Sequence, residues 1–157
     1  MTAGFRVAVR LQRMRDVFPD SPIYFLTLNT HERRRVLANR SIHETFLAFC
    51  LRAQRHGVFV GRYVLMPDHI HLFATFAPEA ICLSLWVKSL KNSMSKRLNE
   101  TCVDAPHWQK GFFDHVLRSD VSYSQKWEYV RLNPLRAGLV INSDDWEFQG
   151  KICDLEI

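Results

Sequence analysis

The fold is decided by the stretch Met66-Pro67-Asp68-His69-Ile70-His71-Leu72-Phe73, which joins two runs rich in β-forming residues. The runs are residues 58–66 and 69–76, and the Pro67-Asp68 pair between them predicts a hairpin or two adjacent antiparallel strands. Residues two apart in a strand point to the same face, so His69 and His71 are expected to present their imidazoles side by side.

Two imidazoles on one face suit a single divalent metal ion. A bare His-x-His pair, however, is more often two ordinary histidines on a half-exposed strand. Zinc hydrolases of the His-x-His-x-Asp-His type also begin this way, but here Leu72-Phe73-Ala74 supplies none of their remaining ligands. The pair therefore indicates a metal site only in combination with other features of the chain.

The segments around this hairpin predict an α+β fold, in which helices pack against an antiparallel sheet. Ser41 and Glu44 form a candidate capping box for the first helix, and Gly57 is its candidate stop. Pro134 is expected to end the last helix. The expected elements are a strand over 23–29, a loop or hairpin arm over 31–35, helices over 41–56, 80–98 and 121–133, a strand over 112–117 and a short strand over 138–141.

The chain has 157 residues and fits one domain over 1–157, with a core over about 22–141 and an acidic C-terminal tail over 142–157. Its net charge of +5 is uneven: residues 1–100 carry 15 Lys and Arg against 7 Asp and Glu, whereas residues 138–157 carry 1 against 5. A basic body fits a polyanionic partner, because Lys and Arg that neutralise phosphates release counterions.

Other features narrow the class of protein. No apolar run approaches the roughly 18 to 20 residues that span a bilayer. Arginines interrupt the apolar residues of the N-terminus, which argues against a signal peptide and for a cytoplasmic protein; they are Arg6, Arg10, Arg13 and Arg15. The cysteines form no Cys-x-x-Cys pair, so reduced, at least partly buried thiols are expected rather than a zinc knuckle or disulfides; they are Cys50, Cys82, Cys102 and Cys153.

A second motif lies in Lys126-Trp127-Glu128-Tyr129-Val130-Arg131-Leu132-Asn133-Pro134. Positions four apart share one face of a helix, so Tyr129 and Asn133 are expected to project together. A phenol can attack phosphorus, and an amide oxygen beside it can complete a metal shell. Taken alone, the pair is also explained by a tyrosine at the edge of the core and an asparagine that ends a helix before proline.

The two motifs together resemble the HUH superfamily, and within it the REP-associated tyrosine transposases, relatives of the single-tyrosine insertion-sequence transposases. The resemblance covers about residues 24–141. It is carried by four blocks in the same order: Tyr24-Phe25-Leu26-Thr27-Leu28, residues 66–73, Trp108-Gln109-Lys110-Gly111-Phe112-Phe113-Asp114-His115, and Glu128-Tyr129-Val130-Arg131-Leu132-Asn133-Pro134-Leu135-Arg136-Ala137-Gly138-Leu139.

The resemblance implies an HUH-type, ferredoxin- or RRM-like antiparallel sheet flanked by helices. It assigns Tyr129 as the catalytic nucleophile and His69, His71 and Asn133 as ligands of Mg²⁺ or Mn²⁺. Asn133 stands where insertion-sequence relatives usually have glutamine, and its shorter side chain reaches less far. The implied activity is cutting and joining of single-stranded DNA, expected to be hairpin DNA, through a 5′-phosphotyrosine intermediate, by a monomer or a homodimer.

Several other residues are candidates for contacts with DNA. The basic candidates for phosphate contacts are Lys88, Lys91, Lys96, Arg97, Arg131 and Arg136, for which a solvated charged face is an equally good interpretation. Trp108, Asp114 and His115 belong to the third block and are expected to serve structure or DNA contact rather than catalysis.

Two other functions fit parts of the sequence. One is a DNA-binding protein that derives from such an enzyme and no longer cuts. The other is an unrelated metal hydrolase with a small substrate, which would form no covalent DNA adduct and would not need Tyr129.

Overall fold

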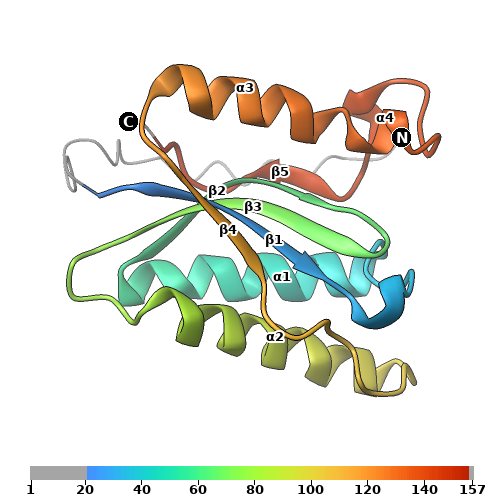
Figure 1. The fold of residues 1–157 in the computed structure, drawn as a ribbon. Coiled ribbons are helices and arrows are strands. Elements are labelled where there is room, and N and C mark those ends of the chain that lie inside the picture. Colours follow the sequence, from blue (N-terminus) through green and yellow to red (C-terminus); the bar gives the residue numbers. More distant parts are fainter. Residues whose placement is uncertain (1–20, 156–157) are drawn as a thin grey trace.

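A five-stranded antiparallel sheet runs through the middle of the computed structural model, which describes residues 21–155 (Figure 1). The strands lie in the order β4-β1-β3-β2-β5. Their bounds are β1 Ile23–Asn29, β2 Val58–Leu65, β3 His69–Phe76, β4 Phe113–Leu117 and β5 Gln149–Lys151. This arrangement confirms the α+β class and the antiparallel sheet that the sequence predicts.

The predicted hairpin is the centre of the sheet. β2 and β3 pair through Leu65 and Ile70 across the short Pro67-Asp68 connection, and β1 pairs with the other edge of β3. β3 is therefore hydrogen-bonded on both sides. In the β1 pairing, Thr27 lies opposite His71 and Asn29 lies opposite His69.

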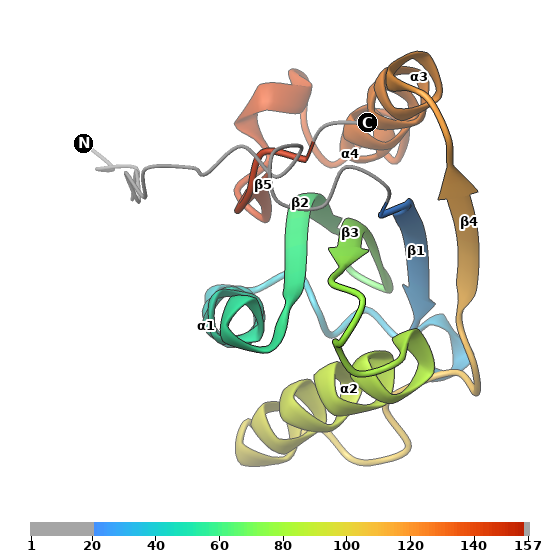
Figure 2. The same cartoon turned by 90° about the vertical axis from the view of Figure 1, so that its left-hand side faces the viewer.

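Helices cover both faces of the sheet. α1 (Arg40–Ala53) and α2 (Leu83–Glu100) lie on one face, whereas α3 (Asp120–Arg131) and the short α4 (Asn133–Arg136) lie on the other (Figure 1 and Figure 2). Because side chains alternate between the two faces along β3, this strand contacts helices on both sides. The Phe76 ring contacts Trp86 of α2, and the Phe73 ring contacts Tyr123 of α3.

The structure corrects the predicted ends of the helices. α1 begins at Arg40, because the Asn39 side chain accepts the backbone N–H of Ile42 at 3.0 Å and caps the helix. Ser41 and Glu44 instead contact Arg97 and Arg40, so the predicted capping box is wrong. Helical structure ends in the 3-10 turn η3 (Gln54–His56), and Gly57 follows with a φ of 77°, as the stop signal predicts. α2 begins at Leu83 rather than at residue 80.

The segment after α3 differs most from the prediction. Pro134 does not end the helical structure, because it lies in the first turn of α4, where its missing N–H costs nothing. Residues 138–141 form turns and bends instead of a strand. The last strand is β5, which pairs with β2 after the 3-10 turn η4 (Ser143–Asp145).

The acidic segment 142–157 is therefore not a tail, at least up to residue 155. Its residues Ile152, Cys153 and Leu155 are buried in the main core. Gly61 of β2 makes room for them, since a Cβ on this residue would lie 2.7 Å from Cδ1 of Leu155. The packed core thus extends well beyond residue 141.

All four cysteines are free thiols. The predicted burial is correct for Cys50 and Cys153 and wrong for Cys82 and Cys102, which are exposed.

The other expectations concern membrane spans, the N-terminus and the loop after β1. Among residues 21–155, no helix is both long and apolar enough to cross a membrane. The arginines between residues 6 and 15 lie outside the described residues. The expected arm over 31–35 contains the 3-10 turn η2 (His31–Arg33), with positive φ at Glu32 and Arg33.

The buried C-terminal segment can be tested with Leu155→Ala. Removing a buried leucine side chain should lower the free energy of unfolding by about 2–4 kcal/mol, measured by urea denaturation. Ile141→Ala is the control, because Ile141 is 97% exposed and its loss should change stability by less than about 0.5 kcal/mol. Equal effects of the two substitutions would show that residues after 141 do not belong to the core.

Candidate active site

His69 and His71 lie side by side at the start of β3, as the sequence predicts. Their ring centroids are 4.7 Å apart, and they share the strand face of Phe73, which packs under α3. Both rings are half-buried. The pair is thus placed on the face of the sheet that carries α3 and α4.

Each imidazole is oriented by a hydrogen bond at Nδ1. His69 Nδ1 lies 2.7 Å from the Asp68 carboxylate, and His71 Nδ1 lies 2.9 Å from the Thr27 hydroxyl. The His71 ring also stacks on Phe25 of β1, with centroids 5.2 Å apart. When Nδ1 is the hydrogen-bonded atom of a histidine, Nε2 is the atom that can bind a metal, and a carboxylate behind the ring fixes its tautomer.

Arg33 of η2 contacts the residues around His69 through its guanidinium group. Its guanidinium donates to Asp68 at 2.9 Å and to Asn29 at 2.7 Å, and it lies 3.2 Å from His69 Nδ1. No pattern in the sequence indicates these roles for Thr27, Asn29 and Arg33. Thr27 and Asn29 lie in the predicted strand 23–29 and Arg33 in the predicted arm 31–35, but no spacing rule connects them with histidines more than 30 residues away.

Burial keeps both imidazoles neutral. It lowers the pKa of His71 to about 3, and the nearby His69 and the cations Arg33, Lys126 and Arg136 disfavour protonation of His71 further. Burial also lowers the pKa of His69, although the Asp68 carboxylate opposes this effect. For Asp68 itself, burial acts to raise the pKa, but hydrogen bonds from His69 and Arg33 outweigh it and the pKa is lowered. Neutral imidazoles beside an ionised carboxylate are the state in which histidines bind metals.

Tyr129 and Asn133 lie where α3 passes into α4, and Arg136 links them. The guanidinium carbon of Arg136 lies 4.2 Å from the centre of the Tyr129 ring. The same group donates to the Tyr129 backbone carbonyl at 2.6 Å and to the Asn133 side-chain oxygen. The end of α3 and α4 lie above the end of the sheet at which β1 stops and β3 begins (Figure 1).

Exposure separates Tyr129 from the other phenols. Tyr129 is 62% exposed, whereas Tyr63 is 3% exposed and burial raises its pKa strongly. Burial also raises the pKa of Tyr123, which packs on Phe73. Tyr24 is half-buried with its ring against Phe76. Tyr129 is therefore the phenol that a large substrate can reach.

A metal ion at the two histidines would need at least one further donor. Within residues 21–155, no group of three or more His, Cys, Asp and Glu side chains could hold a metal ion. Asn133 can supply an oxygen, but this oxygen accepts a hydrogen bond from Arg136. The two imidazoles are donors of a kind that suits a divalent ion, whereas the Asn133 oxygen is occupied by Arg136 in this structure.

The basic residues proposed for DNA contact do not form one surface. Lys88, Lys91, Lys96 and Arg97 lie on α2, on the opposite face of the sheet from the histidines. Lys91 donates to the carbonyls of Gln109 and Gly111. Arg97 binds Ser41 and Glu100, and Arg131 binds Glu128.

Of the basic candidates, Arg136 is the residue beside Tyr129. In the third block, Trp108 donates to the Lys91 carbonyl and to Ser95, which fits the structural role expected of it. Asp114 and His115 are exposed on the edge strand β4.

Comparisons with known proteins identify the family of this chain. The family described as "Transposase IS200 like" matches residues 21–131, a range that includes both histidines and Tyr129 and ends before Asn133. The match covers more than half of the chain, so the chain belongs to the IS200-like transposases, a family of DNA-processing enzymes.

Individual relatives point to one branch of that family. The REP-associated tyrosine transposase of Escherichia coli is 25% identical over 126 residues, which cover 80% of this chain and 73% of the relative. A Haemophilus influenzae protein provisionally given the same name is 22% identical over 141 residues, covering 83% of this chain and 80% of that protein. A solved REP-associated tyrosine transposase bound to a REP hairpin has the same fold, with a TM-score of 0.64, 20% identity, and coverage of 95% of this chain and 82% of that chain.

The buried neutral state of His71 predicts a dependence of stability on pH. In the unfolded chain this imidazole takes up a proton near pH 6.5, whereas in the folded chain it does so only near pH 3. The unfolded state therefore binds more protons between these values, and the free energy of unfolding should fall as the pH drops from about 6.5 toward 3.

The measurement is urea denaturation in EDTA at several pH values, for the wild type and for His71→Gln. The variant lacks this one titrating group, so its slope should be shallower by at most about 1.4 kcal/mol per pH unit. Identical slopes for the two proteins would contradict a buried neutral His71.

Proposed function

We propose that this protein cuts and rejoins single-stranded DNA, with Tyr129 as the nucleophile and with a divalent metal ion held by His69 and His71. The observation that carries the proposal is the histidine pair itself. Asp68 and Thr27 fix the two rings through Nδ1. The rings lie on the sheet face covered by α3, the helix that bears the exposed Tyr129.

The metal would be held by Nε2 of His69 and His71, with the Asn133 oxygen as a third donor after Arg136 releases it. When bound, Mg²⁺ or Mn²⁺ would polarise the scissile phosphate and offset its negative charge. Two nitrogen donors are unusual for Mg²⁺, which prefers oxygen, so Mn²⁺ is expected to bind more tightly in vitro.

The chemical step is a transfer of the phosphoryl group from DNA to tyrosine. The Tyr129 oxygen bonds to phosphorus, the bond from phosphorus to the 3′ oxygen breaks, and the phenolic proton passes to solvent. The products are a 5′-phosphotyrosine and a free 3′-hydroxyl. Attack by a 3′-hydroxyl on the phosphotyrosine reverses the step and joins DNA without another energy source. Arg136 contributes positive charge directly over the Tyr129 ring.

We further propose that the substrate is hairpin DNA. The support comes from relatives: one solved structure of this fold is a REP-associated tyrosine transposase bound to a REP hairpin. A helix-borne tyrosine needs an exposed phosphate, and a hairpin offers a shaped duplex beside single strands. A protein that binds hairpins without cutting them is the alternative, and it would form no covalent adduct.

The role of Tyr129 is tested with Tyr129→Phe. This change removes only the phenolic oxygen, so folding and hairpin binding should persist while cutting falls by at least about 1,000-fold and the covalent adduct disappears. The assay incubates labelled hairpin DNA with protein and Mn²⁺ and resolves adduct and product on a denaturing gel.

Tyr123→Phe is the matched control on the same helix, since its phenol is half-buried, and it should cut normally. Near wild-type cutting by Tyr129→Phe would make water the nucleophile and overturn the proposal. Equal cutting of a linear duplex would overturn the single-strand preference. A wild-type protein that binds the hairpin but never forms an adduct would support the non-cutting alternative.

The metal site is tested by graded substitutions. His69→Ala and His71→Ala should abolish Mn²⁺ binding, measured by calorimetry, together with cutting. Asp68→Asn should weaken Mn²⁺ binding by about 10- to 100-fold, because the carboxylate no longer orients His69.

Asn133→Ala should be milder than either histidine change, since water can replace one oxygen ligand. His56→Ala is the control, because His56 is exposed in η3, and this change should alter neither the Mn²⁺ affinity nor the rate of cutting. Unaltered Mn²⁺ affinity in His69→Ala would place the metal elsewhere.

A further inference from the structure

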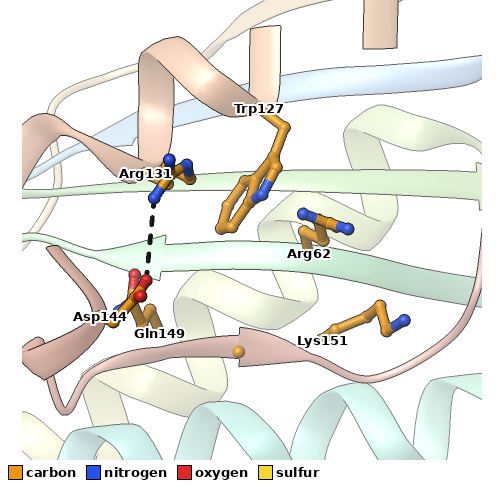
Figure 3. Close-up of a pocket in the computed structure, with 7 residues that line it drawn as sticks. Arg62, Trp127, Arg131, Asp144, Gln149 and Lys151 are labelled. Atoms are coloured by element: carbon orange, nitrogen blue, oxygen red, sulfur yellow. Dashed lines mark ion pairs between the residues drawn. The ribbon is translucent and has the colours of Figure 1, made fainter. Parts of the chain in front are cut away.

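A second concave site lies on the other flank of α3 from Tyr129. Residues two apart in a helix point in nearly opposite directions, so Trp127 and Arg131 face away from Tyr129. They line a cavity of about 280 Å³ between α3, β2 and β5 (Figure 3). Arg62 of β2 and Lys151 of β5, which are paired in the sheet, form the opposite wall.

Three of the seven residues that line this cavity are cationic. Arg62, Arg131 and Lys151 face a single carboxylate, that of Asp144, which lies 3.7 Å from Arg131. Two of the three cations also pair with carboxylates outside the cavity: Arg131 with Glu128 at 2.9 Å, and Lys151 with Asp154 at 2.5 Å.

Arg62 differs from the other two cations. Among the described residues no acidic side chain forms an ion pair with it, and its guanidinium lies over the indole of Trp127 at 4.9 Å from the ring centre. An aromatic face positions a guanidinium without using its N–H donors. Arg62 is therefore a fixed cation that keeps its hydrogen-bonding capacity for an anion.

We infer that this cavity binds a backbone phosphate of the single-stranded part of the substrate DNA, with Arg62 as the main contact. The inference rests on the proposed function, because it concerns the same substrate. A guanidinium forms paired hydrogen bonds to phosphate oxygens, and Lys151 adds a second positive charge.

The shape of the cavity favours a single strand over a duplex. Its volume is below the roughly 300–1,000 Å³ of sites for drug-sized ligands, so it has room for a phosphate and part of one nucleotide. A flexible single strand can lay one phosphate into such a hollow beside an aromatic ring, and its unpaired bases are free to stack on aromatic side chains, whereas the bases of a duplex are stacked on one another.

The test measures binding of two fluorescent DNAs in EDTA by anisotropy: a hairpin with a single-stranded extension, and the same hairpin without one. Arg62→Gln should weaken binding of the extended hairpin by about 10-fold and lower the slope of log affinity against log salt concentration by about 1. Binding of the blunt hairpin should not change. Arg62→Lys should recover part of the affinity, because it restores the charge without the paired donors.

Arg52→Gln is the matched control, since it removes an exposed arginine from α1 on the other face of the sheet, and it should bind like the wild type. Lys151→Gln is a second variant at the exposed rim, expected to lower the salt slope on the extended hairpin even if Arg62→Gln fails to fold.

An unchanged affinity and salt slope in folded Arg62→Gln would overturn the inference, as would an equal loss on both hairpins or no wild-type binding of the extended hairpin. The proposed function is judged separately, by whether the wild type forms the Tyr129 adduct with Mn²⁺. Binding that depends on Arg62 without an adduct would refute catalysis alone, and an adduct with binding independent of Arg62 would refute the phosphate site alone.

Discussion

The two-residue alternation of β3 is the constraint on which the rest of the structure depends. This strand lies between β1 and β2 and is hydrogen-bonded to both. Its residues Ile70 and Leu72 are fully buried, while His69 and His71 point to the face of α3. A register shift of one residue would exchange these faces and drive two imidazoles into the core. The same packing that stabilises the fold therefore also fixes the position of the histidine pair.

The histidine site depends on a balance between burial and charge. Burial is the largest cause of the lowered pKa of both imidazoles. The Asp68 carboxylate would favour protonation of His69, but Arg33 binds that carboxylate and offsets much of its charge. The result is a pair of neutral rings held at Nδ1 with rigid support from β1 and η2. Side chains held in place in this way lose little conformational freedom when a ligand binds to them.

Helix α3 divides its face of the sheet into two regions of different character. Trp127 and Val130 pack toward the sheet and anchor the helix. One flank carries Tyr129 with Arg136 across its ring. The other flank carries the cavity with Arg62 and Arg131. Because a helix presents successive residues around its whole circumference, α3 can expose a phenol on one side and line a cavity on the other.

The sequence by itself determined the local parts of this protein: the hairpin, the presence of the main helices, and the shared face of His69 and His71. The single helix predicted for Tyr129 and Asn133 is wrong in detail, because α3 ends at Arg131 and Asn133 begins α4. Periodicity and turn residues set the local features, and both act over a few residues.

Only the tertiary structure decided what gathers around them. Thr27 reaches His71 from 44 positions away. β5 has the sequence Gln-Gly-Lys, which does not predict a strand, and it forms one because it pairs with the edge of β2. Arg136 lies across Tyr129, whereas four of the other basic candidates lie on the opposite face. Sheet pairing and helix packing join residues far apart in the chain, and no short-range pattern in the sequence records which partners will meet.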